Sequence, residues 1–83
     1  MTGGKRMGTA TIIIQKSGFV LMCADWDIED IRDMGNGVKA ICDDRGSEIT
    51  IPSYATETKE PGDEHEECIC YRFDDIEIYV EFF

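Results

Sequence analysis

The stretch CICYRFDDIEIYVEFF, residues 68–83, decides the fold predicted for this chain. Two runs of alternating apolar and polar residues flank Asp74-Asp75, which is the pattern of two half-buried strands joined by a tight turn. On one face of this hairpin, Phe73 lies opposite Ile76, Tyr71 opposite Ile78, and Ile69 opposite Val80. Arg72 faces Glu77 on the other side, as an opposite-charge pair across the strands. A slip by one residue would mix the two faces, so the sequence predicts an antiparallel hairpin in this register.

Two further hairpins are predicted nearer the N-terminus. Residues 9–15 and 19–24 are apolar runs that flank a turn at Lys16-Ser17 or Ser17-Gly18. Residues 38–42 and 47–51 flank a loop at 43–46, in which Gly46 can supply a left-handed conformation. With this loop length, Ala40 lies opposite Ile49, and Val38 lies opposite Ile51. Residues 54–58 are expected to add a short strand at the edge of the sheet.

A short helix is predicted over residues 27–34. Ile28, Ile31 and Met34 are spaced by three, which suits one stripe of a helix. Asp27 is a favourable N-cap, and Gly35 is a favourable residue just past the helix end. The expected fold is therefore a small α+β domain over residues 9–83, mostly antiparallel sheet with one helix after the second strand. Residues 1–8 are expected to form a flexible N-terminal arm.

The charge balance of the chain is strongly acidic. The 83 residues include 18 Asp and Glu against eight Lys and Arg, for a formal net charge of −10. The first sixteen residues hold three of the bases and no acid, so residues 17–83 carry a net charge of −13. Such a surface repels nucleic acid and anionic membranes, so neither is an expected direct partner. It attracts basic proteins or cations, although surplus acid also serves solubility alone.

The cysteines are Cys23, Cys42, Cys68 and Cys70, and all four fall in predicted strands. A free thiol in a strand behaves as a small apolar residue. His65, Cys68 and Cys70 are of the residue types that bind zinc, but C-x-C spacing inside a strand does not suit a zinc knuckle. No metal or other cofactor is therefore expected, and a small Cys/His metal-binding module is the second alternative for the function.

No catalytic set can be assembled around His65, the single histidine of the chain. The carboxylate pairs Asp43-Asp44 and Asp74-Asp75 fall at predicted turns, where aspartate is common for backbone reasons. We therefore expect no catalytic residues and no enzymatic activity.

The acidic residues point instead to a binding role. Fifteen of the 18 fall in three groups, within residues 25–33, 57–67 and 74–81, and Tyr79 adds an aromatic anchor beside two of the acids. Alternate residues on a strand are about 6.7 Å apart, so their carboxylates can occupy a groove that normally holds phosphates. The residues expected to contact the partner are Asp27, Asp30, Asp33, Asp63, Glu64, Glu66, Glu67, Glu77, Tyr79 and Glu81. The expected function is a small acidic inhibitor that mimics nucleic acid on a basic partner protein, such as a nucleic-acid-binding complex.

This profile, small and acidic with no catalytic set, is similar to that of phage-encoded inhibitors such as anti-restriction and anti-CRISPR proteins. The likeness is one of composition, and it implies a viral protein that binds a host protein. The alternative is a structural or homo-oligomeric subunit, such as a homodimer, that pairs through an edge of its sheet. The longest apolar run, residues 19–24, is too short to cross a membrane, and no signal-cleavage site follows it, so a cytoplasmic location is expected.

Overall fold

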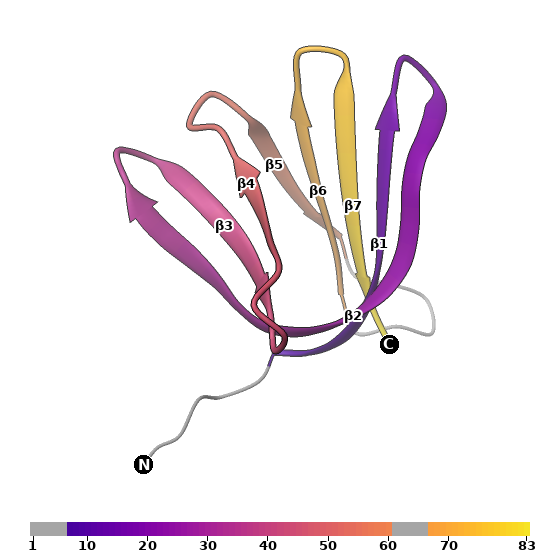
Figure 1. Cartoon of the computed structure of the whole chain (residues 1–83). Coiled ribbons are helices and arrows are strands. Elements are labelled where there is room, and N and C mark those ends of the chain that lie inside the picture. Colours follow the sequence, from indigo (N-terminus) through magenta and orange to yellow (C-terminus); the bar gives the residue numbers. More distant parts are fainter. Residues whose placement is uncertain (1–6, 61–66) are drawn as a thin grey trace.

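The computed structural model describes residues 7–60 and 67–83, and every regular element within these ranges is a β-strand. The strands are β1 (Gly8–Lys16), β2 (Phe19–Gly35), β3 (Val38–Asp43), β4 (Glu48–Ile51), β5 (Thr56–Glu60), β6 (Cys68–Phe73) and β7 (Ile76–Phe82). They form one antiparallel sheet in the order β4-β3-β2-β1-β7-β6-β5 (Figure 1). The predicted α+β class is therefore wrong, because the described part of the chain is all-β. A helix able to span a membrane is absent from the described ranges.

The predicted helix at residues 27–34 is the second half of β2. A β-bulge interrupts the pairing of β2 with β3 between Ile28 and Asp30. A bulge adds one residue to a strand, so Ile28 and Ile31 point to the same face although they are three apart. Ile28 is fully buried and Ile31 packs against the same core. The bulge thus imitates the spacing of a helical stripe, whereas Met34, the third member of that stripe, is 55% exposed.

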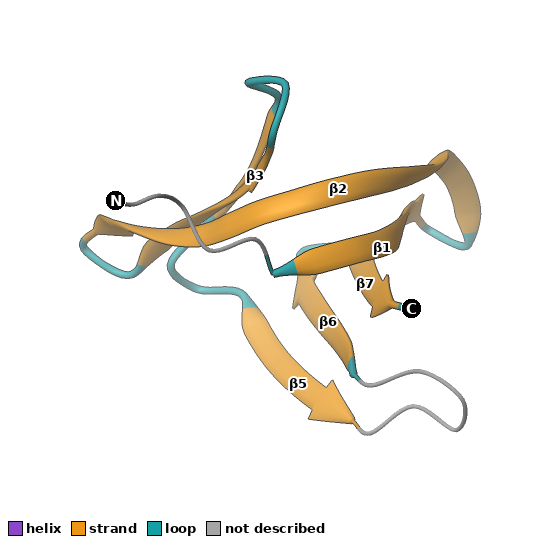
Figure 2. Cartoon of the chain, turned by 90° about the horizontal axis from the view of Figure 1, so that it is seen from below, coloured by secondary structure: helices purple, strands orange, loops and turns teal. Residues whose placement is uncertain are grey.

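The length of β2 lets it pair with two different strands on its two sides. Its first half, to Ile28, pairs with β1, and its second half, from Ile28, pairs with β3. Figure 1 shows β2 sweeping beneath the other strands from the β1 hairpin to the β3 hairpin. This sweep curls the sheet, and Figure 2 shows β3 and β5 on opposite sides of the space that it encloses. The Lys39 Nζ to Glu57 Oε2 ion pair, 3.1 Å long, joins β3 to β5 across the open side of the curl.

The apolar side chains meet on the inner face of the curled sheet. The core comprises Ala10, Ile12, Ile28, Ile41, Ile51, Ile69, Tyr71, Ile78, Val80 and Phe82. These residues come from every strand except β5, so the curl buries one continuous cluster without a second layer. Most buried side chains lie on this face, which accounts for the alternation of apolar and polar residues in β1 and β7. Ala40, Cys42 and Cys70 alternate with core residues along β3 and β6 and are also buried.

The C-terminal hairpin has the predicted register. Phe73 pairs with Ile76 and Tyr71 with Ile78, and the Arg72 Nε to Glu77 Oε2 distance on the opposite face is 2.8 Å. Asp74 adopts a φ of 54° in the turn, a conformation that Asp and Asn tolerate better than most residues. β7 also pairs with β1, which places this hairpin beside the central strands of the sheet.

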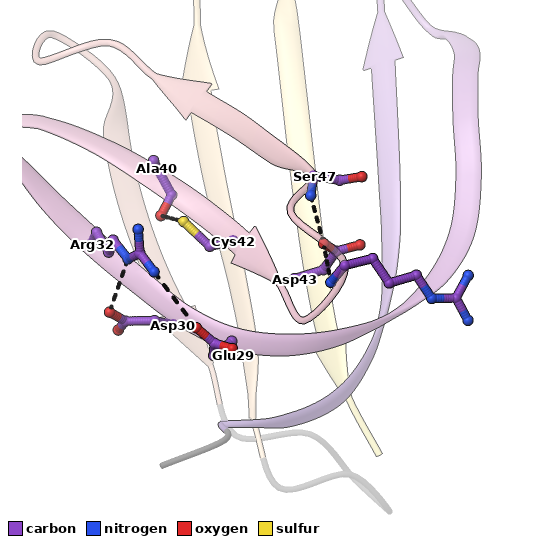
Figure 3. A network of polar contacts seen from close by, with 8 residues as sticks. Glu29, Asp30, Arg32, Ala40, Cys42, Asp43 and Ser47 are labelled. Carbon is purple, nitrogen blue, oxygen red and sulfur yellow. Dashed lines mark hydrogen bonds and ion pairs between the residues drawn. The ribbon is translucent and has the colours of Figure 1, made fainter. Parts of the chain in front are cut away.

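The other two hairpins differ in detail from the prediction. The first turn lies at Ser17-Gly18, the second of the two alternatives, because Lys16 pairs with Phe19. The register predicted for the β3–β4 hairpin is wrong by one residue, since Ile41 rather than Ala40 pairs with Ile49. The Asp43 carboxylate is the reason: it accepts hydrogen bonds from the backbone N–H of Arg45 and of Ser47, which draws Ser47 into the loop (Figure 3). β5 begins two residues later than predicted, at Thr56.

Candidate functional site

Four carboxylates gather on the outer face of the sheet, the side away from the core. Asp25 and Asp27 project from β2, and Glu77 and Glu81 project from β7; we call this set the outer acidic face. β1 lies between the two strands, and Thr11 pairs with Asp25 on one side and with Glu81 on the other. Neighbouring strands are about 4.8 Å apart, so the backbones at Asp25 and Glu81 are about 10 Å apart. Asp27 lies about 7 Å further along β2.

Two threonines of β1 hold the aspartates of this face. Thr11 Oγ1 donates to Asp25 Oδ1, and Thr9 Oγ1 donates to Asp27 Oδ1, each at 2.9 Å. The repeat follows from the register, because Thr9 pairs with Asp27 as Thr11 pairs with Asp25. A hydroxyl restrains a carboxylate but does not neutralise it, and each aspartate keeps its Oδ2 atom for another donor. No ion pair within the described residues engages Asp25, Asp27 or Glu81.

The β7 end of the face is partly neutralised. Arg72 on β6 donates through Nε to Glu77 Oε2, and the hydroxyl of Tyr79 donates to Glu77 Oε1 at 3.2 Å. Arg72 holds the pKa of the Glu77 carboxyl below its usual range, and the reciprocal interaction raises the pKa of Arg72. Tyr79 is half-buried between Glu77 and Glu81. This end of the face therefore offers an aromatic edge and one remaining carboxylate, that of Glu81.

A hollow of about 310 Å³ adjoins the aspartates where β2 passes the β3–β4 loop. Its lining residues are Ala24, Asp25, Trp26, Asp27, Asp43, Asp44, Arg45 and Ser47. Asp44 N–H donates to the carbonyl of Asp27 at 3.2 Å, which ties the loop to β2. The hollow thus has four carboxylates and one guanidinium in its lining, and the carboxylate of Asp43 is already bonded within the loop. The surplus negative charge favours a cationic side chain of a partner.

The structure separates the sequence-predicted site residues into several places. Asp27, Glu77, Tyr79 and Glu81 share the outer face. Asp30 lies further along β2 and is paired with Arg32 at 3.6 Å, and the same guanidinium is 3.5 Å from Glu29 (Figure 3). Asp33 falls on the core side of the sheet, with Ile31, and accepts a hydrogen bond from the N–H of Gly35. Asp63, Glu64 and Glu66 lie outside the described residues.

Glu67 lines a second cavity, of about 290 Å³, at the open side of the curl. Asp30, another residue predicted to contact the partner, lines the same cavity, and the lining also includes Lys39, Glu57, Lys59 and Tyr71. The hydroxyl of the buried Tyr71 has no hydrogen-bond partner within the described structure, although the Glu57 carboxylate is close by. Burial raises the pKa of Tyr71, and the neighbouring carboxylate adds to the effect. Three carboxylates and two lysines line this cavity, so its net charge is small and it does not extend the outer acidic face.

The sequence analysis did not include Asp25, Thr9 or Thr11 among the residues of the outer acidic face. Asp25, Thr9 and Thr11 form the most regular part of the face, yet the predicted helix began at Asp27 and separated that residue from Asp25. The signal was present as Thr-x-Thr in one strand and Asp-x-Asp in the next. Alternate residues of paired strands share a face, so two such motifs predict a cross-strand ladder once both segments are recognised as strands.

The described residues contain no cluster of three His, Cys, Asp or Glu side chains that could hold a metal ion. The zinc alternative requires His65, which lies outside the described residues. Burial raises the pKa of the Cys42 thiol, whose Sγ lies 3.6 Å from the carbonyl oxygen of Ala40 (Figure 3). Cys23, on β2, is exposed.

Comparisons with protein-family models, with curated proteins and with solved structures give no match for this chain.

Proposed function

We propose that this protein is a small acidic binding module whose outer acidic face occupies a basic, nucleic-acid-binding surface of a partner protein. The observation that carries the proposal is the pair of aspartates, Asp25 and Asp27, that threonine hydroxyls restrain without neutralising. Ordinary surface carboxylates beside basic residues form ion pairs within their own protein, as Glu77 does with Arg72. Asp25 and Asp27 instead have no ion pair within the described residues.

The physics of the proposal is electrostatic complementarity. A groove that binds nucleic acid carries lysine and arginine side chains placed to neutralise a row of phosphates. Asp25, Asp27 and Glu81 offer negative charges about 7 Å and about 10 Å apart on a rigid sheet. The net charge of −10 adds long-range attraction, which raises the rate of encounter with a basic partner. Because the threonines hold the aspartates in place, less side-chain entropy is lost on binding.

The hollow beside Asp25 and Asp27 supplies a place for one basic side chain of the partner. A guanidinium that enters there would meet the free Oδ2 atoms of the two aspartates. Arginine suits this position because its planar fork of N–H donors bonds carboxylates in fixed geometry. In this proposal the protein acts in the cytoplasm as an inhibitor without catalytic activity, as the likeness to phage-encoded inhibitors implies.

The test is capture of a partner from host lysate with elution by graded salt, followed by identification of the eluted protein by mass. The purified partner should bind with an affinity that falls steeply as salt rises, and nucleic acid should compete for it. The double variant Asp25→Asn/Asp27→Asn should raise Kd at least about tenfold, which corresponds to about 1.4 kcal/mol.

A matched control removes the same number of charges elsewhere. Asp33→Asn/Asp74→Asn changes two aspartates that lie away from the outer acidic face, and asparagine tolerates the positive φ of residue 74. This control should leave Kd within about twofold of the wild-type value. Equal losses from the two double variants would show that only net charge matters, and an absence of competition by nucleic acid would remove the mimicry.

A further inference from the structure

Within the described residues, one margin of the sheet is a strand edge without a neighbouring strand. The first half of β2 pairs with β1 alone, because pairing with β3 starts only at Ile28. Figure 1 shows this half of β2 forming the right-hand margin of the sheet. Followed from Phe19 along that margin, the first backbone hydrogen bond to another segment among the described residues is the one from Asp44 N–H to the Asp27 carbonyl. We call residues 19–26 on this side the free β2 edge.

The free β2 edge is apolar and exposed at its outer end. Phe19, Val20 and Leu21 are 75%, 58% and 62% exposed, and no charged residue occurs from Phe19 to Ala24. These six residues span about 20 Å of strand. A bulge in the pairing with β1 leaves Leu21 as the extra residue of β2, without a partner residue on β1. Long apolar edges of this kind attract another strand.

The other two margins of the sheet carry the usual protection against such pairing. β4 has only four residues, exposes Glu48 and Thr50, and is followed by Pro52, which cannot donate to a ladder. β5 has the sequence TETKE, with charged residues along its length. The free β2 edge carries one such device, the bulge at Leu21, but neither a proline nor a charge over its apolar run. The contrast within one molecule singles out this edge as an interface.

We propose that two copies of this chain pair antiparallel through the free β2 edge and form a dimer with a two-fold axis. Antiparallel pairing of the segment with itself sets one apolar run against the other. It also brings the Lys16 end of each copy toward the Asp25 end of its partner, so that opposite charges meet at both ends of the run. A basic strand from another protein is a poorer fit, because residues 19–24 carry no acidic side chain to pair with it. A two-fold interface uses the same surface on both copies and closes at the dimer.

The dimer and the proposed partner binding meet at Asp25, which belongs to the outer acidic face and lies at one end of the free β2 edge. The outer acidic face is formed by side chains on one face of the sheet, whereas the dimer uses the backbone edge of β2. Each copy carries a net charge of −10, so general repulsion opposes association and salt should relieve it. Salt should therefore strengthen the dimer, whereas it should weaken binding of a basic partner. Failure of one of the two proposals does not imply failure of the other.

The experiment is sedimentation velocity of the full chain under reducing conditions, at low and high salt, with protein up to about 1 mM, the Kd of a very weak complex. Wild-type protein should show a concentration-dependent dimer that salt strengthens. Leu21→Lys places a charge on the free β2 edge without touching the core, and it should raise the dimer Kd at least tenfold. Met34→Lys, at a 55% exposed apolar residue near the other end of β2, is the matched control and should leave Kd within twofold.

A second readout reports the position of the interface. Cys23 is the exposed cysteine of the described chain and lies within the free β2 edge. A short bifunctional thiol reagent should link two copies of the wild-type protein, and both Cys23→Ser and Leu21→Lys should abolish the link. A wild-type monomer at about 1 mM in both salts would overturn the proposal, as would a dimer that Leu21→Lys does not weaken. Assembly beyond the dimer would contradict the two-fold closure.

Discussion

Replacing Ile28 by alanine should lower the free energy of unfolding by about 2–5 kcal/mol, whereas replacing Met34 by alanine should change it by less than about 0.5 kcal/mol. Ile28 is fully buried where β2 changes partners, so the substitution leaves a cavity at the junction of two strand pairings. Met34 is 55% exposed. A helix over residues 27–34 would instead place both side chains on one buried stripe and make both substitutions costly. The pair of variants therefore tests whether this segment is the bulged strand that carries the aspartates.

The assay is equilibrium unfolding in urea, followed by the fluorescence of Trp26, which is the single tryptophan and packs against the core. With an m-value of about 1 kcal/mol/M for a small domain, Ile28→Ala should lower the midpoint by about 2 M or more, or leave the protein unfolded. A domain of this size has a total stability of about 4–12 kcal/mol, so the effect is a large part of it. Similar losses from Ile28→Ala and Met34→Ala would refute the strand assignment of residues 28–34.

Three further outcomes are expected. Thr9→Val/Thr11→Val keeps the shape of β1 and the net charge but frees the two aspartates of β2, so it should weaken partner binding severalfold; unchanged Kd would mean that the hydroxyls do not position the carboxylates. Tyr71→Phe removes a buried hydroxyl that has no hydrogen-bond partner and should raise the free energy of unfolding by about 1 kcal/mol, while a loss of stability in urea would show that the hydroxyl is bonded. An NMR titration should place the pKa of Glu77 below the ordinary value of about 4.3 and, in the Arg72→Gln variant, closer to it. Because the pKa of Glu77 is lower in the folded than in the unfolded state, the stability from the Arg72–Glu77 pair is present above a pH of about 4.3 and is lost as the pH falls through the folded-state pKa. A pKa of Glu77 at or above the ordinary value would contradict the pairing.

The C-terminal hairpin could be predicted residue by residue because its signals are local. The turn at Asp74-Asp75 and the period-two alternation on both sides specify one register, and Arg72 opposite Glu77 supports it. The β3–β4 hairpin shows the limit of this reasoning. Its alternation allows two registers, and the choice depends on Asp43, whose carboxylate caps the loop backbone in a way that loop length alone does not reveal.

The second half of β2 could not be predicted from local signals. A bulge at one position converts period two into a spacing of three, and Asp27 and Gly35 look like helix caps as well as strand residues. What decides the matter is non-local: β3 supplies the hydrogen-bonding partner for residues 28–35, and the curled sheet buries Ile28. A segment of about two helical turns has little stability of its own to compete with that packing.

Only part of the membership of the outer acidic face could be predicted from the sequence. Charge and composition indicate an acidic binding surface, and the alternation in β7 places Glu77, Tyr79 and Glu81 on one face. Which other acids join them depends on strand order, because β1 stands between β2 and β7. That order is a property of the whole sheet, and it brings Asp25 level with Glu81 across Thr11.

The most direct test of the outer acidic face is an NMR titration of isotopically labelled protein with its captured partner. The perturbed amides should map to residues 9–11, 25–27 and 77–81, and Asp25→Asn/Asp27→Asn should remove most of the effect. Perturbations confined to Phe19, Val20 and Leu21, or spread over the open side of the curl near Lys39 and Tyr71, would contradict the proposed role of this face.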